Sequence, residues 1–428
     1  MTSTRISDVR AREILDSRGR PTVEAEVWLE GGAMGMASAP AGASRGAAEA
    51  HELRDGEARH GGRGVRAAVK AATTEIRDAL VGRDVLDQRG LDHAMRARDG
   101  TPQLERLGGN ATVAVSMAAL RAGAAAKGEK LYRHIAAVAA TTQPLMPMPM
   151  INILSGGLHA GRGMDVQDFL MIPVGASSYG EALEWTSRVR NVAADLAAEQ
   201  GLTTLLADEG GLSPGFADSR EALAFMVRAF ERAALRPGED AAIALDIASS
   251  SLVDAARRYH FARQGRVLDS AAMIDELVAW SRDFPIVSIE DGLAEEDWDH
   301  WPALTERLAH IQMVGDDLFC THPARVAKGR ALGVANAVLI KINQAGTFSD
   351  ALDAIAESRA GGYATVISAR SGETEDSFLA DLAVGVAGGQ IKIGSVRNSE
   401  RLAKYNQLLR IAEDDLPFAG RAALAGTK

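Results

Sequence analysis

Short apolar runs alternate with amphipathic segments in the part of the chain that follows residue 150. Their length and apolar character are those of buried β-strands. The runs are Met150–Leu154, Phe169–Val174, Thr203–Ala207, Ala242–Leu245, Ile286–Ile289, Gln312–Val314, Ala337–Ile340, Ala364–Ile367 and Gln390–Ile393. Between two of them, Ser349–Arg359 begins at a good N-cap residue and stops before Gly361, which is typical of a helix. The alternation predicts an α/β fold with a closed (β/α)8-type barrel, and an open doubly wound sheet is the alternative. The first two runs are candidates for a hairpin.

The first part of the chain has a different pattern. Thr22–Val27 alternates in the manner of a strand, a Gly/Ala-rich stretch follows up to Gly46, and helical segments continue to about Ala140. The segment that follows, TTQPLMPMPM, holds three prolines and predicts a domain junction. We therefore expect a smaller N-terminal α+β domain over residues 1–140 and a barrel domain over residues 141–428.

Composition narrows the class of protein. The chain has 428 residues, of which 46% are hydrophobic and 24% charged, and this is typical of a folded two-domain protein. A net charge of −10 argues against nucleic acid as a partner. No apolar run is long enough to span a bilayer, so we expect no membrane association. The sequence shows no secretory signal and has one cysteine, Cys320, which together predict a cytoplasmic location.

Charged residues follow the apolar runs. Three carboxylates end consecutive runs, and three cations end the next three; in chain order they are Asp246, Glu290, Asp316, Lys341, Arg370 and Lys392. Asp208 and Glu209 follow Thr203–Ala207 in the same way. In a barrel these positions ring the mouth in which active sites lie. A single charge at a strand end more often reaches solvent, but the repeated pattern favours a site.

The order of charges predicts a chemistry. Three convergent carboxylates repel one another unless a divalent cation such as Mg²⁺ binds them, and the neighbouring cations suit an anionic substrate. A lysine beside a metal and two further cations is expected to have a depressed pKa, so Lys341 is a candidate general base. Glu209 is a candidate acid. Together they predict removal of a proton α to a carboxylate, followed by loss of a β-substituent.

Long motifs occur throughout the chain: DSRGRPTVEAEV, APAGASRG, HELRDG, DVQDFLMIPVGA, ADEGG, PIVSIEDG, VGDDLF, LIKINQAGT, SARSGETEDSFLADLAVG, GQIKIG and ERLAKYNQLLRI. In this order they resemble the motifs of enolases, the phosphopyruvate hydratases. Active sites of the enolase superfamily combine a Lys or His base with Mg²⁺. The resemblance implies an enolase-type hydro-lyase that acts on a small phosphorylated carboxylate, with two Mg²⁺ ions, the second arriving with substrate.

The resemblance also implies residue roles. Asp246, Glu290 and Asp316 match the ligands of the first metal ion, and Ser44, in a mobile loop, matches a ligand of the second. Lys341 matches the base and Glu209 the acid. The substrate-binding positions are His159, Gln167, Asp168, Arg370, Ser371 and Lys392. Glu24 and Arg410 match a pair that crosses a homodimer interface. Simpler alternatives are a turn cap for His159, a backbone partner for Gln167, a solvated Glu24 and an ordinary loop serine for Ser44. The DSRG motif at Asp16 predicts a structural turn.

Several positions in the site depart from the enolase pattern. Ala369 replaces a histidine, and Asp168 replaces a glutamate. Further departures lie at Ala41, Arg45, Ser155 and Ile393. Arg45 adds a cation to the lid, so it is a candidate substrate-binding residue. The changes predict a larger, more basic pocket in a specialised paralogue, an enolpyruvate-ester synthase or transferase such as carboxyphosphonoenolpyruvate synthase of phosphonate biosynthesis. An ordinary glycolytic enolase, which dehydrates 2-phosphoglycerate to phosphoenolpyruvate, is the alternative, and a non-catalytic binding protein is a third.

Overall fold

An antiparallel sheet of three strands forms one face of the N-terminal domain. The computed structural model describes residues 3–43 and 46–426. The sheet has the order β1-β2-β3, formed by β1 (Ile6–Leu15), β2 (Pro21–Leu29) and β3 (Met34–Ser38). The long helix α4 (Gly109–Lys127) packs on β2 and β3. A Cβ atom at Gly35 of β3 would collide with the carbonyl of Ala118, so a glycine is required for this close approach.

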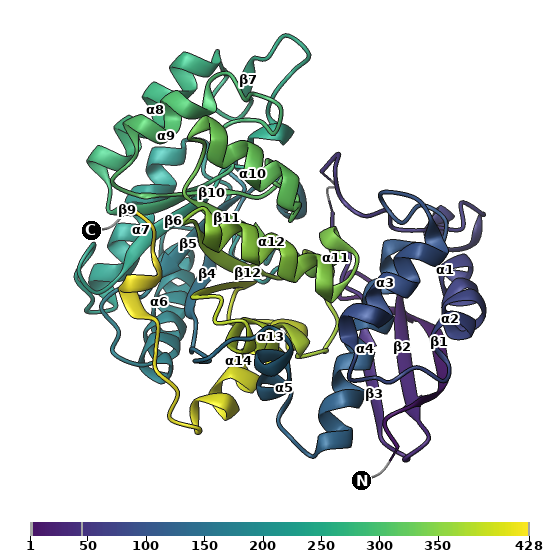
Figure 1. Ribbon diagram of the computed structural model, residues 1–428. Coiled ribbons are helices and arrows are strands. Elements are labelled where there is room, and N and C mark those ends of the chain that lie inside the picture. The colour runs from purple at the N-terminus through teal and green to yellow at the C-terminus, as the bar shows by residue number, and fades with distance from the viewer. Residues whose placement is uncertain (1–2, 44–45, 427–428) are drawn as a thin grey trace.

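Shorter helices complete this domain on the side of the sheet that α4 covers (Figure 1). They are α1 (Arg66–Ala71), α2 (Arg77–Leu80), α3 (Gln88–Asp99) and α5 (Leu131–Val138). A π-helical turn at Ala72–Ile76 joins α1 to α2. The α+β architecture expected for the N-terminal domain is confirmed.

Eight strands close into a barrel beside this domain (Figure 1). Around the barrel they follow the order β10-β11-β12-β13-β4-β5-β6-β9. Their bounds are β4 (Met148–Ser155), β5 (Asp168–Ile172), β6 (Ala242–Asp246), β9 (Ile286–Glu290), β10 (Gln312–Gly315), β11 (Ala337–Ile340), β12 (Ala364–Ser368) and β13 (Gln390–Gly394). The predicted barrel is therefore confirmed, and the open sheet is wrong, because β13 pairs with β4 to close the ring.

Two features of the barrel strands bear on the predictions. β5 runs antiparallel to both β4 and β6, so the expected hairpin of the first two runs is present. The predicted strand at Thr203–Ala207 is wrong. This segment lies in the connection between β5 and β6, and only an isolated bridge from Leu206 to Leu212 pairs it. Leu205 is 74% exposed, so the apolar run does not mark a buried strand here.

Helices surround the barrel. They are α6 (Tyr179–Glu199), α7 (Ser219–Arg232), α8 (Ser270–Asp283), α9 (Trp301–Arg307), α10 (Pro323–Leu332), α11 (Ile342–Ala345), α12 (Phe348–Ala360), α13 (Phe378–Gly385) and α14 (Ser399–Ala412). A small hairpin of β7 (Tyr259–Phe261) and β8 (Arg266–Leu268) lies outside the ring. The helix expected at Ser349–Arg359 is α12, whose N-cap is Thr347, because that side chain accepts from the Asp350 amide.

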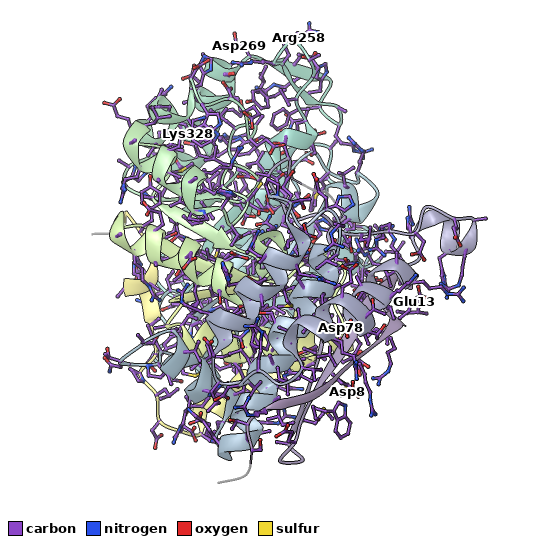
Figure 2. All side chains as sticks on the ribbon, turned by 45° about the vertical axis from the view of Figure 1, so that its right-hand side comes forward. Asp8, Glu13, Asp78, Arg258, Asp269 and Lys328 are labelled. Carbon is purple, nitrogen blue, oxygen red and sulfur yellow. The ribbon has the colours of Figure 1, made fainter. Side chains whose placement is uncertain are left out.

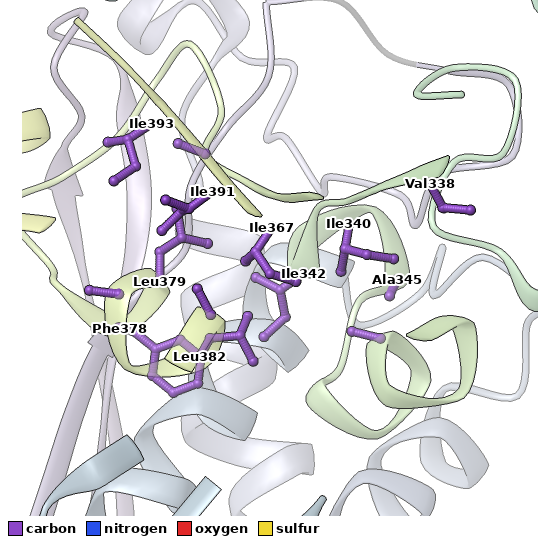
Figure 3. Packing of buried hydrophobic residues seen from close by; sticks show 14 of the residues in the cluster. Val338, Ile340, Ile342, Ala345, Ile367, Phe378, Leu379, Leu382, Ile391 and Ile393 are labelled. Carbon is purple, nitrogen blue, oxygen red and sulfur yellow. The ribbon is translucent and has the colours of Figure 1, made fainter. Parts of the chain in front are cut away.

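Side chains alternate between the two faces of the barrel strands, and the apolar ones form an outer and an inner layer. Figure 3 shows residues of the outer layer, where Ile340, Ile367 and Ile391 of neighbouring strands pack toward α11 and α13. The inner layer fills the barrel and includes Met150, Ala244, Leu339 and Val366. Since side chains alternate with a period of two, the next inward positions along these strands are polar. As a result, four polar or charged side chains point inward at the C-terminal mouth: Asn152, Asp246, Lys341 and Ser368.

Candidate active site

The strand-end charges meet at one mouth of the barrel. Asp246 and Glu290 end β6 and β9, and Asp316 directly follows β10; these three strands are neighbours in the ring. The three cations follow on the next three strands: Lys341 after β11, Arg370 after β12 and Lys392 within β13. The predicted order of acids and then bases around the mouth is thus a feature of the fold.

Lys392 is the centre of a buried ion-pair network. Its Nζ donates to Asp246 Oδ2 at 2.8 Å and to the two Glu290 oxygens at 2.9 and 2.8 Å. Burial alone would lower the pKa of Lys392, but the two carboxylates raise it well above its ordinary value. Burial and the charge of Asp246 raise the pKa of Glu290 in turn. The amine therefore offsets carboxylate charge that burial would otherwise disfavour.

Lys341 forms an ion pair with Asp316. Burial would lower the pKa of this lysine, but the facing Asp316 raises it above its ordinary value. The depressed pKa expected from the sequence is not found in this arrangement and stays a prediction for the metal-bound site. The expectation placed a metal ion and two cations beside the amine, whereas a carboxylate lies against it here, and an opposite charge favours the protonated form.

A second cluster of carboxylates lies beside Asp316. Within residues 3–43 and 46–426, Asp291, Asp316 and Asp317 each place one ligand atom within 4.8 Å of the others. The Asp291 carboxylate also accepts from the amides of Asp316 and Asp317, at 2.9 Å each. Burial and the charge of Asp316 raise the pKa of Asp317 to about 7. These repelling hard oxygen donors suit a divalent cation such as Mg²⁺. Only Asp316 is shared with the ligand set expected from the resemblance.

The opposite side of the mouth holds Glu209. Its Oε2 accepts from Asn152 Nδ2 at 3.2 Å, and its carbonyl accepts from the Ser395 amide at 2.9 Å. Burial would raise the pKa of Glu209, but the positive charges of His159, Arg401 and Lys392 lower it. This carboxyl is therefore held in its ionised form.

His159 and Asp168 form a pair next to Glu209. His159 Nε2 lies 3.2 Å from Asp168 Oδ1, and Ser155 Oγ donates to the same oxygen at 2.6 Å. Burial would lower the pKa of His159, but the Asp168 charge raises it to about 9. Although His159 does lie in a turn, its ring faces the site. Gln167 donates from Nε2 to Asp246 Oδ2 at 3.0 Å, so its amide contacts a side chain and not the backbone alone.

The remaining cation lies between the two domains. Arg370 Nη1 donates to Glu49 Oε2 at 3.0 Å and to Asn343 Oδ1 at 2.9 Å. Ser371 Oγ, next in the chain, accepts from Arg18 Nη1 at 3.0 Å. Glu49 and Arg18 belong to the N-terminal domain, so this domain contributes to the side of the mouth that the resemblance assigns to phosphate.

A cavity joins these groups. Its lining includes His159, Gln167, Asp168, Glu209, Asp246, Asp316, Lys341, Ala369, Arg370, Ser371 and Lys392. Its volume is about 50 Å³, room for a few water molecules. The larger pocket expected from Ala369 and Asp168, relative to an ordinary enolase, stays a prediction. Glu290 lies behind Lys392 and does not line the cavity. Ser44 and Arg45 lie outside the described residues.

Some residues of the mouth escaped the sequence analysis. Asn152 lies on β4 and follows the buried Met150 by two positions, so the alternation of side chains along the strand predicts that it points inward. Glu49 and Arg18 come from the N-terminal domain, and no local pattern predicts which of its charges reach the barrel. Asp291 and Asp317 directly follow Glu290 and Asp316 in sequence, and only the turn of the backbone brings them into the cluster.

Glu24 and Arg410 do not meet each other in the described chain. Glu24 accepts from Arg12 at 2.6 Å and from Ser38 Oγ at 3.2 Å. Arg410 is exposed on α14, where it donates to Gln407 at 3.4 Å. Their expected contact across a dimer stays a prediction. In the described residues, no helix combines the length and apolar character needed to cross a membrane.

Comparison with protein families accounts for almost the whole chain. The family model described as "Enolase, N-terminal domain" matches residues 6–135. The model described as "Enolase, C-terminal TIM barrel domain" matches residues 143–428. Both halves of the architecture, the small α+β domain and the closed barrel, agree with these matches. This protein is a member of the enolase family.

Proposed function

We propose that this protein is an Mg²⁺-dependent enzyme that forms the enolate of a small phosphorylated carboxylic acid. The observation that carries the proposal is the cavity bounded by Lys341 and Glu209, with Arg370 and Lys392 beside them. A base, an acid and two anion-binding cations around one cavity are the groups that α-proton removal and β-elimination require. Phosphorylated three-carbon acids, 2-phosphoglycerate and phosphoenolpyruvate, match this set of charges.

Each side chain has one role in this proposal. Arg370 and Ser371 bind the phosphate, and Lys392 binds the carboxylate. Lys341 takes the proton from the carbon next to the carboxylate, which requires that its contact with Asp316 part first. Mg²⁺ held by Asp246, Glu290 and Asp316, with Ser44 reaching a second ion, would supply positive charge that stabilises the enolate.

Glu209 protonates the leaving oxygen. The structure holds this carboxyl ionised, because neighbouring cations lower its pKa. An anionic substrate bound at Lys392 offsets those cations, and the pKa of Glu209 then rises toward a value at which it can donate a proton. His159 and Asp168 lie beside Glu209 and contact the leaving group, and Gln167 orients Asp246.

The proposal is tested with purified protein, Mg²⁺ and 2-phosphoglycerate. We expect exchange of the C2 proton with solvent deuterium, measured by NMR, and formation of an enol product, measured by absorbance. Chelation of the metal should stop both. Absence of exchange under saturating Mg²⁺ would contradict the proposal and favour the non-catalytic binding protein.

A specialised paralogue is the second candidate, and the pairing of Ser155 with Asp168 favours it. Both residues depart from the enolase pattern, and both contact each other beside His159. Ala369 adds a short side chain to the same cavity wall. These changes alter the side of the site that handles the leaving group. They fit an enolpyruvate-ester synthase that takes a second anionic group, such as carboxyphosphonoenolpyruvate synthase. An ordinary glycolytic enolase is the alternative.

The assembly and location belong to the same proposal. We propose a cytoplasmic homodimer in which Glu24 and Arg410 meet across the interface, with the N-terminal domain ending near residue 140. The exposure of Arg410 supports this pairing. Sedimentation of the purified protein with and without Arg410→Ala tests the dimer, and a monomeric wild type would exclude it.

A further inference from the structure

The DSRG turn brings an arginine from the N-terminal domain to the barrel mouth. The Asp16 carboxylate closes this turn by accepting from the amides of Arg18 and Arg20, at 2.8 and 2.9 Å. Arg18 Nη2 also lies 3.1 Å from Asp16 Oδ2, and its side chain is 5% exposed. The pair packs on Gly372, where a Cβ atom would collide with both side chains. The turn and Gly372 therefore hold the Arg18 side chain in place at the edge of the site.

Two further contacts join the Arg18 guanidinium to other segments. Nη1 donates to Ser371 Oγ at 3.0 Å, and Nη2 donates to the Ala41 carbonyl at 2.9 Å. Ala41 and Gly372 exchange backbone hydrogen bonds of 2.8 and 2.9 Å. A single buried cation thus contacts the turn, the segment after β3 and the loop after β12.

We propose that Arg18 is a positioning residue that fixes the hydroxyl of Ser371 as a hydrogen-bond donor to a bound phosphate group. This rests on the proposed function of the same site. A guanidinium only donates, so the Ser371 oxygen accepts from it and keeps its own hydrogen for another acceptor. Ser371 lines the cavity next to Arg370. The hydroxyl hydrogen is therefore directed to the place where phosphate oxygens bind.

Arg18 acts mainly by orienting the Ser371 hydroxyl and less by its charge, because the Asp16 carboxylate is paired with it. The backbone of the loop is held separately. The buried guanidinium of Arg401 on α14 donates to the carbonyls of Arg370 and Ser371 at 2.7 Å each, and to that of Ile393 at 3.0 Å. Loss of Arg18 consequently frees the Ser371 hydroxyl while Arg401 keeps the loop in position.

A double-mutant cycle tests this, with inorganic phosphate as the probe and calorimetric binding as the readout. Arg18→Met and Ser371→Ala should each weaken phosphate binding by about tenfold, the scale of one hydrogen bond to a charged group. The double variant should bind no more weakly than Ser371→Ala alone. Arg18→Lys should recover part of the affinity, since one ammonium can reach Ser371 but not also Ala41.

Arg59→Met is the matched control. Arg59 pairs with Glu13 at 2.9 Å within the N-terminal domain, which lies on the right-hand side of Figure 2, where Glu13 is labelled. Neither residue lines the cavity. This variant should bind phosphate as the wild type does. Additive losses in the double variant would overturn the inference, as would a wild type that binds no phosphate. If Arg18→Met does not fold, the cycle is run with Arg18→Lys.

Turnover separates this inference from the function on which it rests. With 2-phosphoglycerate, Arg18→Met should raise KM about tenfold and change kcat less, because the phosphate is held before and after proton removal. A protein that shows the non-additive phosphate binding but no C2-proton exchange would keep the inference and refute the proposed reaction.

Discussion

Ser155 Oγ lies 2.6 Å from Asp168 Oδ1, and this buried bond joins two residues that both depart from the enolase pattern. The same Asp168 oxygen lies 3.2 Å from His159 Nε2. Ser155→Ala should reduce the free energy of unfolding by about 1 to 3 kcal/mol, because it removes a buried donor to a charged group. Urea denaturation measures this. Ser187→Ala, at an exposed position on α6, serves as the control. A loss no larger than that of the control would mean that the bond contributes nothing to stability.

The raised pKa of His159 predicts a pH dependence. Its value of about 9 exceeds the ordinary 6.5 because Asp168 holds the imidazolium. A raised pKa adds stability that is complete below pH 6.5 and is lost as the pH rises through about 9. His159→Gln should remove this part of the change in unfolding free energy between those pH values. Denaturation at several pH values, without added metal, measures it. An identical pH profile in the variant would show that another group is responsible.

Metal affinity distinguishes the two carboxylate sets. We expect Asp316→Asn and Glu290→Gln each to abolish measurable Mg²⁺ binding in calorimetry, because a hard cation needs several oxygen ligands. Asp317→Asn should weaken binding by less than about tenfold if Asp317 lies beside the ligands and does not itself bind the ion. The reverse order, with Glu290→Gln tolerated and Asp317→Asn not, would place the ion among Asp291, Asp316 and Asp317.

The base and the acid should fail at different steps. Lys341→Ala should stop exchange of the substrate C2 proton with deuterium, since the other lysine in the lining of the cavity, Lys392, is held by two carboxylates. Glu209→Gln should keep exchange and lose elimination. NMR measures the first and absorbance the second. Equal loss of exchange in both variants would refute this division of roles.

The departures predict a substrate preference. The wild type should turn over 2-phosphoglycerate about 100-fold or more below an ordinary enolase, on the scale of losing one positioned catalytic group. Ala369→His together with Asp168→Glu should raise that rate. Arg45→Thr, in a segment outside the described residues, should impair a bulkier anionic substrate without changing Mg²⁺ binding. Full glycolytic turnover that Arg45→Thr leaves unchanged would identify an ordinary enolase.

The sequence predicts the barrel and most of the mouth because both depend on strand phase. Apolar runs define the strands, and the charges that follow Ala244 or Leu339 must point inward when the side chains alternate. Thr203–Ala207 has the same composition as those runs, but nothing local reveals that its leucines are exposed. Contacts between the domains are equally hidden. In the sequence, nothing distinguishes Arg18 from other turn residues, and only the fold shows that it contacts Ser371.

The sequence predicts well which groups lie together in the site, but it predicts less well which of them bind one another. Lys341 lies where expected, but its pKa depends on whether the Asp316 oxygen or a cation is beside it, and this depends on distances of a few ångströms. The metal ligands show the same limit, since Asp291 and Asp317 differ from Glu290 and Asp316 by one position along the chain.

Closure of the ring by β13 has a consequence for how the protein is made. Ribosomes release the acids of β6 and β9 well before the strand that carries Lys392, so a nascent chain holds Asp246 and Glu290 without their counter-charge. Burying those carboxylates alone is costly, so we expect the barrel to gain its last strand and this counter-charge together. Arrested chains that end before β13 should be digested readily by protease, and chains that extend past α14 should resist it.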